Sequence, residues 1–392
     1  MSISSILLVL AKSKKYLNDE VREDTIYKYM RVLNEKLNSI GPLPANLYGG
    51  LSGIAFAVNI ISNEYPYYKK TLNKLNKLIV EKVYYMISYI EHEDGVKMNY
   101  YDIISGISGI ALYLMQFKDD YILECVKRIN KCLIGIAKEK LVYDVNVTGL
   151  YISSENQFLE KDKDFYTKGS FNFGLSHGIC SPLVAISLSY ENNILVDGQE
   201  QIIRYLLNML DKYKVKKSNC IFWNQVLSFD EYNNFNDKNY DVEPRASWCY
   251  GTPGIARSIY ISARAIGDDM YINLAKDSFY HLCKKKKCNE WDLNSPTICH
   301  GFSGMAIILK LMSYDENNED YLPALQVLVN EIFNLYNREY KYLFKNVEIE
   351  EFGDLRYEDN LDILTGSSGV ILALMFMMDY EINDIFRILG IN

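Results

Sequence analysis

The 392-residue sequence lacks several features that would point to common classes of protein. It has no run of about 18 apolar residues, so it predicts no transmembrane helix. Its 42 basic residues are outnumbered by 50 acidic ones, which disfavours a nucleic-acid partner because such a partner selects a basic face. The first 17 residues contain a short apolar run with no preceding Lys or Arg and no small-residue cleavage site. We therefore expect a helix there, not a signal peptide, and a cytoplasmic protein.

Histidine is scarce and cysteine is dispersed. Eight cysteines in so long a chain, without a CxxC pair, do not form a disulfide scaffold, and reduced thiols are expected. The four histidines stand at 92, 177, 281 and 300. With 49% hydrophobic residues the chain can bury a large core, and we expect one domain over residues 1–392.

One short phrase recurs along the chain: Gly-x-x-Gly followed at once by an apolar helix. The glycine pairs are 50 and 53, 106 and 109, 251 and 254, 301 and 304, and 366 and 369. A further copy keeps Gly178 but has Ser181 in place of the second glycine, which leaves that helix entry in doubt. The segments that follow are apolar on nearly every side, as buried helices are.

Longer amphipathic segments lie between these buried helices. Residues 119–138 and 322–336 have apolar side chains at three- and four-residue spacing with charges opposite. Alternation of buried inner and half-solvated outer helices predicts an all-α fold, an α/α toroid, with an open solenoid as the competing arrangement. Residues 141–170 alternate in polarity and predict a small β-containing insertion. The Asn- and Asp-rich residues 220–247 predict a long loop.

The rare residues stand immediately before the repeated glycines. Cys249 precedes the fourth buried helix, Cys299 and His300 precede the fifth, and His177 precedes the third. If the repeats are related by rotation, these side chains meet at one mouth of a central cavity. Two thiolates and an imidazole suit zinc, and three protein ligands leave a fourth tetrahedral position open, as in catalytic sites.

Other residues allow competing interpretations. Cys283 and Cys288 flank a lysine run and form a rival thiol pair, although their flanks favour a solvated charge run at the exposed end of an outer helix. Asp102 and Arg245 stand four residues before Gly106 and Cys249, where the sequence is equally compatible with a structural cap or ion pair and with a catalytic role. Asp362 occupies the same position before Gly366, which weakens any argument from position alone.

The combined motifs resemble those of the lanthionine synthetase C-like cyclase family over nearly the whole chain. The resemblance rests on the glycine phrase, on Asn172-Phe-Gly-Leu-Ser-His-Gly178, on Trp248-Cys-Tyr-Gly251 and on Cys299-His-Gly301. It implies an α/α toroid and one Zn²⁺ per chain held by Cys249, Cys299 and His300. It also implies that His177 is the acid–base histidine. Further catalytic roles are implied for Asp102, Arg245 and Tyr250.

This resemblance implies a lyase-type enzyme that forms carbon–sulfur bonds. Peptide Cys thiols would add to dehydroalanine or dehydrobutyrine and close (methyl)lanthionine thioether rings in a lantibiotic precursor. The implied partners are the dehydrated precursor peptide, a dehydratase and an ABC transporter, through which the protein would also reach the membrane. We expect a monomer.

Three alternatives remain at this stage. Protein prenyltransferases also alkylate zinc-bound thiolates in an α/α barrel, but they need a basic diphosphate pocket, and only Arg245 and Arg257 stand near the phrases. A relative without cyclase activity could bind zinc and a thiol such as glutathione. A scaffold could merely dock the dehydratase and transporter, although intact ligand motifs argue against a purely structural role.

Overall fold

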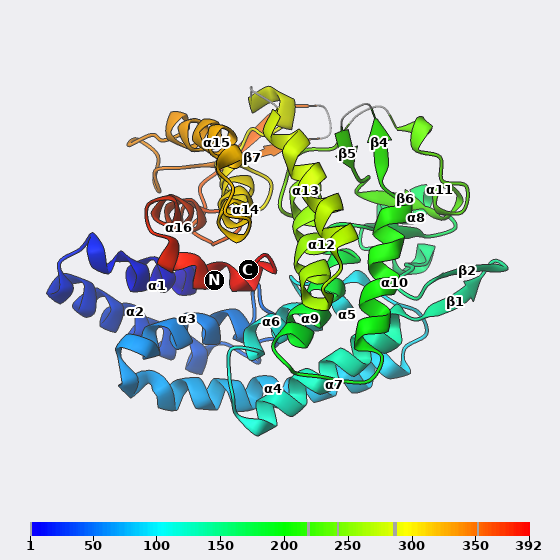
Figure 1. Ribbon diagram of the computed structural model, residues 1–392. Helices are drawn as coiled ribbons and strands as arrows, with labels where there is room; N and C mark the ends of the chain where they lie inside the picture. The colour runs from blue at the N-terminus through cyan, green and yellow to red at the C-terminus, as the bar shows by residue number, and fades with distance from the viewer. Residues whose placement is uncertain (1, 218–219, 241–242, 285–287, 351–352) are drawn as a thin grey trace.

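The computed structural model describes residues 2–217, 220–240, 243–284, 288–350 and 353–392. Within these ranges, seven helices form an inner ring (Figure 1). They are α1 (Ser2–Lys12), α3 (Leu51–Glu64), α6 (Ile107–Leu114), α9 (Cys180–Glu191), α12 (Thr252–Ile266), α14 (Phe302–Asp315) and α16 (Ser367–Met378). Each packs against the next, and α16 packs against α1. The ring is therefore closed, and the predicted toroid is confirmed over the open solenoid.

A second layer of amphipathic helices surrounds the ring. It contains α2 (Asp19–Ser39), α4 (Lys69–His92), α7 (Asp120–Ala137), α10 (Gln199–Lys212), α13 (Asp269–Lys284) and α15 (Leu322–Asn334), each packed on the inner helix before it in the chain. Both amphipathic segments predicted from the sequence are helices of this layer. The helix expected at the N-terminus is α1, but its place in the ring was not predicted, because no glycine phrase introduces it, and α2 was not predicted.

The repeated glycines are required by close backbone contacts. A Cβ atom at the second glycine of a phrase would lie about 2 Å from the carbonyl oxygen six residues earlier; at Gly304, that oxygen belongs to Ile298 and the distance is 2.0 Å. In the third repeat the equivalent Ser181 instead donates a hydrogen bond from Oγ to the carbonyl of Leu175 at 2.6 Å. In this repeat, a side-chain hydrogen bond replaces the close glycine contact at the start of the helix, and α9 begins at Cys180.

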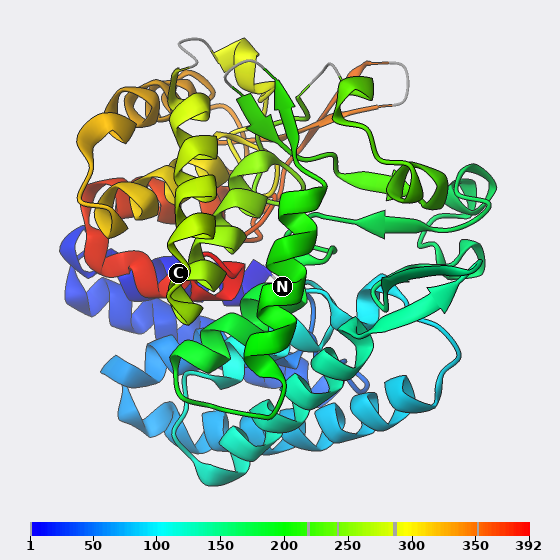
Figure 2. The ribbon, with the colours of Figure 1, turned by 45° about the vertical axis from the view of Figure 1, so that its right-hand side comes forward.

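Short strands gather on one side of the toroid (Figure 2). They form four antiparallel pairs: β1 (Glu139–Val142) with β2 (Val145–Thr148), β3 (Ser170–Asn172) with β6 (Val226–Ser228), β4 (Val215–Lys217) with β5 (Cys220–Phe222), and β7 (Asn346–Ile349) with β8 (Leu355–Glu358). The insertion predicted at 141–170 contains the end of β1 and all of β2, and reaches β3.

The long loop predicted at 220–247 was wrong in part. Its first half contains β5, β6 and the short helix α11 (Phe229–Asn233), which begins with a capping box between Ser228 and Glu231. Its Asn and Asp content favours a loop, but the pairing of β5 with β4 and of β6 with β3 overrides that local preference. The second half, after Tyr240, contains no helix or strand among its described residues.

The remaining elements are short. Further α-helices are α5 (Met98–Tyr101) and α8 (Glu160–Phe165). The 3-10 segments are η1 (Ser13–Lys15), η2 (Pro66–Tyr68), η3 (Ser154–Asn156), η4 (Asp237–Asn239), η5 (Cys288–Trp291), η6 (Glu319–Tyr321) and η7 (Tyr380–Leu389). Across the described ranges, every helix is too short or too polar to cross a membrane.

The C-terminal segment runs through the middle of the ring. Backbone carbonyls at its end accept hydrogen bonds from three separate parts of the toroid: Ile388 from the Tyr48 hydroxyl at 3.1 Å, Leu389 from the Trp248 indole at 3.0 Å and Ile391 from the Arg257 guanidinium at 2.8 Å. The C-terminal segment therefore occupies the centre of the ring.

Candidate active site

Backbone hydrogen bonds join the turns that precede the inner helices. In chain order, the amide of Tyr48 donates to the carbonyl of Ile104 (3.2 Å), Ile103 to Ser176 (3.2 Å), Ser176 to Cys249 (3.1 Å), Cys249 to Cys299 (3.2 Å) and Cys299 to Leu364 (2.9 Å). The carbonyl in each bond belongs to the residue two positions before the first glycine of its phrase. The turns therefore follow one another around the ring in register, as the repeats predicted.

This register brings Cys249 and Cys299 side by side. The thiol of Cys299 donates to the sulfur of Cys249, which lowers the pKa of Cys249 and raises that of Cys299. The Ser247 hydroxyl, 3.5 Å from the Cys249 sulfur, also lowers the pKa of Cys249. This hydrogen bond favours the thiolate form of the buried Cys249 beside the half-buried thiol of Cys299, a setting that a cation would stabilise.

His300 lies next to this sulfur pair but is turned toward a carboxylate. Its Nε2 atom is buried and 3.2 Å from Oε1 of Glu348, although the N–H is not aimed along that line and makes no well-formed hydrogen bond. Burial lowers the pKa of His300, but the hydrogen-bonding capacity and charge of Glu348, with the Cys249 thiolate, raise it overall.

The donor set fits a thiophilic metal ion, although its geometry is incomplete. Within the described ranges, no three His, Cys, Asp or Glu side chains yet stand where they could share an ion. The sulfurs of Cys249 and Cys299 are already side by side. The His300 side chain would have to rotate to bind the same ion. The buried Nε2 without a formed hydrogen bond is the kind of unsatisfied polar atom that such a rearrangement can satisfy.

His177 and Asp102 form a second pair in the same place. Nδ1 of His177 lies 2.5 Å from Oδ2 of Asp102, a carboxylate that is only 1% exposed, whereas the imidazole is 31% exposed. The hydrogen bond fixes which ring nitrogen faces the carboxylate and leaves Nε2 toward the cavity. His177 and Asp102 lie 75 residues apart in the sequence, on two different turns. The register of the repeats brings these turns together.

Asp102 also caps its own turn, which is the structural role that its position in the sequence allowed. Its Oδ1 accepts hydrogen bonds from the amides of Ser105 (2.6 Å) and Gly106 (2.7 Å). Asp362 makes the equivalent bond to the amide of Thr365 at 2.6 Å, but its other oxygen binds only the Thr365 hydroxyl. The two aspartates share the capping role, and Asp102 alone carries a histidine.

Tyr250 and Arg245 complete the wall of the cavity. The Tyr250 ring lies 6.2 Å from that of His177, and burial raises the pKa of its phenol to about 12, so it stays protonated near neutral pH. Arg245 is 18% exposed, and its Nε lies 3.9 Å from Asp292. The cavity has a volume of about 1260 Å³ and is lined by both cysteines, both histidines, Tyr250 and Arg245.

The other cysteines have different surroundings. Burial raises the pKa values of Cys125, Cys132, Cys180 and Cys283 to about 12, so these thiols stay protonated. The predicted rival pair cannot be evaluated as a pair, because the side chain of Cys288 lies outside the described residues. His92 is exposed on α4, and His281 is half-buried on α13, away from the cavity wall.

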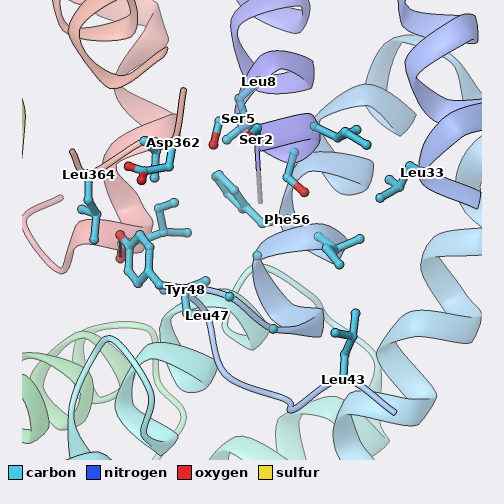
Figure 3. Close-up of a pocket in the computed structure, with 18 of the residues that line it drawn as sticks. Ser2, Ser5, Leu8, Leu33, Leu43, Leu47, Tyr48, Phe56, Asp362 and Leu364 are labelled. Atoms are coloured by element: carbon cyan, nitrogen blue, oxygen red, sulfur yellow. Dashed lines mark hydrogen bonds between the residues drawn. The ribbon is translucent and has the colours of Figure 1, made fainter. Parts of the chain in front are cut away.

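A separate apolar cavity adjoins the site (Figure 3). It has a volume of about 360 Å³ and lies among α1, α2, α3 and the turn before α16. Leu364 and Thr365 line both cavities, and the Tyr48 ring stands between α3 and that turn. None of the predicted site residues lines it, so the candidate chemistry belongs to the larger cavity.

Sequence reasoning missed two polar neighbours of the sulfur pair. Ser247 stands two residues before Cys249 and could have been noticed as a hydroxyl beside a predicted ligand. Glu348 comes from β7, almost fifty residues after His300, and the β7–β8 hairpin was not predicted. No local motif marks that carboxylate, and only the folded chain brings it to the site.

Comparison with known proteins agrees with this architecture. The family model described as lanthionine synthetase C-like protein matches residues 2–389. The chain is 26% identical over 383 residues to the nisin biosynthesis protein NisC of Lactococcus lactis subsp. lactis, covering 97% of this chain and 85% of that protein. It is also similar to the solved structure of nisin cyclase, with a TM-score of 0.83, 24% identity and coverage of 99% and 90% of the two chains.

The closed double ring, the register of its turns and the family match all lead to one assignment. This chain belongs to the lanthionine synthetase C-like family.

Proposed function

We propose that this protein is a zinc-dependent lanthionine synthetase. It would add Cys thiols of a precursor peptide to dehydroalanine or dehydrobutyrine and so close thioether rings. The observation that carries the proposal is the meeting of Cys249 and Cys299, one of them with a lowered pKa, in a cavity that also contains the His177–Asp102 pair. Family membership and the names of the two relatives support the same reaction.

Cys249, Cys299 and His300 would hold the metal ion. A bound Zn²⁺ would supply Lewis acidity that lowers the pKa of an incoming thiol, which is otherwise about 8.5. Three protein ligands leave one tetrahedral position for that substrate sulfur. A thiol must lose its proton to bind the ion, so occupancy would depend on pH.

The remaining residues would manage charge and protons during the addition. The substrate sulfur bonds to the β-carbon, the alkene electrons move toward the carbonyl as an enolate, and a proton is delivered to the α-carbon. The Arg245 guanidinium is the cation in the cavity wall that can stabilise the enolate oxygen. His177, oriented by Asp102, can carry the proton. The protonated Tyr250 can donate a hydrogen bond beside it.

The cavity is large enough for a peptide segment and not only for a small thiol. Its volume of about 1260 Å³ exceeds the 300–1,000 Å³ typical of small-molecule pockets. This supports a dehydrated lantibiotic-type precursor as the substrate over a glutathione-sized ligand. A dehydratase that prepares this peptide, and an ABC transporter that exports it, are the proposed partners at the membrane.

A direct assay uses a dehydrated, Cys-containing peptide. Cyclisation leaves peptide mass unchanged, so the product is treated with a thiol alkylator and analysed by mass spectrometry. We expect loss of alkylation with the zinc-loaded protein, and full alkylation after chelation or with C249A. A zinc-loaded protein that binds the peptide without protecting its thiols would instead be a binding member of the family.

A further inference from the structure

A carboxylate outside all the sequence motifs lies against the predicted metal-binding histidine. Glu348, on β7, lines the large cavity, and its Oε1 is 3.2 Å from Nε2 of His300. The His300 side chain is 12% exposed and that of Glu348 33% exposed, so the contact sits at the edge of the cavity, partly shielded from water. A carboxylate placed there can accept the Nε2–H after a small rotation of the ring.

Glu348 is itself held by a buried polar network. Oδ1 of Asn346 accepts hydrogen bonds from the hydroxyls of Ser295 and Thr297, each at 3.1 Å. Its Nδ2 then donates to Oε1 of Glu348 at 2.7 Å. Ser295, Thr297 and Asn346 are each at most 1% exposed. The network connects the segment before His300 with the β7–β8 hairpin. These hydrogen bonds restrict the position of the Glu348 carboxylate.

The other nitrogen of His300 is left for the cavity. In the described part of the chain, Nδ1 of His300 has no hydrogen-bond partner, and it is not among the enclosed polar atoms. Cys249 and Cys299 line the same cavity wall. Metal-binding histidines characteristically donate their second N–H to a carboxylate or carbonyl, which fixes the tautomer and the ring orientation.

We propose that Glu348 is a positioning residue that accepts the Nε2–H of His300 and thereby presents Nδ1 to the metal ion. Asn346 holds Glu348 for this role. The inference rests on the proposed function, because it concerns the third ligand of the proposed zinc site. It adds a residue from a hairpin that no sequence motif connects to the site.

The test measures zinc affinity, without any need for activity. Purified protein is titrated with Zn²⁺ against a chromophoric chelator. Replacing Glu348 by Ala removes the acceptor, and zinc should bind about 10–100-fold more weakly. E348Q keeps an acceptor oxygen but not the charge, so its affinity should lie between those of E348A and the wild type. This partial rescue would not be expected of a residue that only supports the hairpin.

The matched control is E350A on the same hairpin. Glu350 is exposed and 3.8 Å from Arg356, so E350A removes the same charge without touching His300. Its zinc affinity should equal that of the wild type. The visible spectrum of the Co²⁺-loaded proteins gives a second measurement: E348A should alter the ligand-field bands, whereas E350A should leave them unchanged. Should E348A fold poorly, the near-isosteric E348Q carries the comparison.

The outcomes separate this inference from the proposed function. Wild-type protein that binds zinc, together with E348A and E348Q that bind it equally tightly, would overturn the positioning role and leave the zinc site intact. Wild-type protein that binds no zinc at these thiols would overturn the proposed metal site, and the inference with it.

Discussion

At the residue scale, one carboxylate has a role in the fold and a proposed role in the chemistry. Asp102 uses one oxygen to cap its turn and the other to hold His177. Asp362 provides a natural comparison, because it caps the corresponding turn without a histidine. Substitution of Asp362 therefore tests the capping role alone, whereas substitution of Asp102 tests the capping role together with the proposed catalytic role.

Replacing Asp102 by Asn should therefore slow cyclisation by about 10²–10⁴-fold while zinc content is retained. The amide oxygen can still accept from the turn amides, but the group no longer carries the charge that supports a protonated His177. Single-turnover cyclisation, with metal analysis of the same sample, measures both quantities. D362N is the control and should keep the wild-type rate; equal losses in the two variants would reduce Asp102 to a cap.

At the element scale, the glycine phrases carry both the architecture and the placement of the site. Each second glycine packs against a carbonyl at a distance that excludes a side chain, and the same turn places a cavity residue two positions before the first glycine. Close backbone contact and site register are therefore consequences of one local geometry. This is why a weak motif, repeated, predicted where distant residues meet.

Gly304→Ala should lower the free energy of unfolding by about 1–3 kcal/mol or more, because its Cβ would lie 2.0 Å from the carbonyl oxygen of Ile298. Gly135→Ala, at an exposed position in the last turn of α7 with no atom within 4 Å, should instead raise it by about 0.5–1 kcal/mol. Denaturant unfolding of both variants measures the contrast. Equal effects would show that the phrase glycines are not sterically required.

An ion pair between α2 and α3 gives a pH-dependent test at the same scale. Arg22 is 1% exposed and donates from Nη1 to Oε2 of Glu64 at 2.9 Å, with a second, shorter contact beside it. This hydrogen bonding lowers the pKa of Glu64. A carboxylate with a lowered pKa stabilises the fold above its unfolded pKa, about 4.3, and loses that contribution as the pH falls through its folded value.

Glu64→Gln should accordingly reduce the free energy of unfolding by about 1–2 kcal/mol at pH 7, a value that allows for the partial exposure of Glu64. The difference from wild type should begin to shrink below the unfolded pKa of about 4.3, and should vanish only below the lowered folded pKa, where Glu64 is protonated in both states. Glu35→Gln, whose partner Arg31 is 3.6 Å away on an exposed face, should change little at either pH. A pH-independent difference for Glu64→Gln would contradict the assigned charge interaction.

At the scale of the whole molecule, the C-terminal segment ties the ring together from inside. The Trp248 indole, beside the predicted ligand Cys249, donates to the carbonyl of Leu389. Trp248→Phe leaves that carbonyl without its partner in a buried setting and should lower the free energy of unfolding by about 1–3 kcal/mol. Thermal unfolding followed by circular dichroism measures the loss; an unchanged melting temperature would mean that the segment contributes nothing through this bond.

The sequence predicted much of this molecule, because the repeats encode it. Six inner helices, the closed ring and the convergence of Cys249, Cys299 and His177 all follow from the phrase and its register. The ring position of α1, the helix α2, the strands after Cys220 and the β7–β8 hairpin were missed, since none of them carries a repeat and the strand pairing is non-local. Glu348 was missed for the same reason.

In the proposed site, turns that are distant in the sequence bind one metal ion, which keeps one coordination position for the sulfur of the substrate. X-ray absorption at the zinc edge tests this arrangement directly on the loaded protein. We expect two sulfurs at about 2.3 Å and light-atom ligands at about 2.0 Å, with a third sulfur on addition of a Cys-containing substrate peptide. A zinc coordination shell without sulfur, or one that does not change when the peptide is added, would contradict the proposed site.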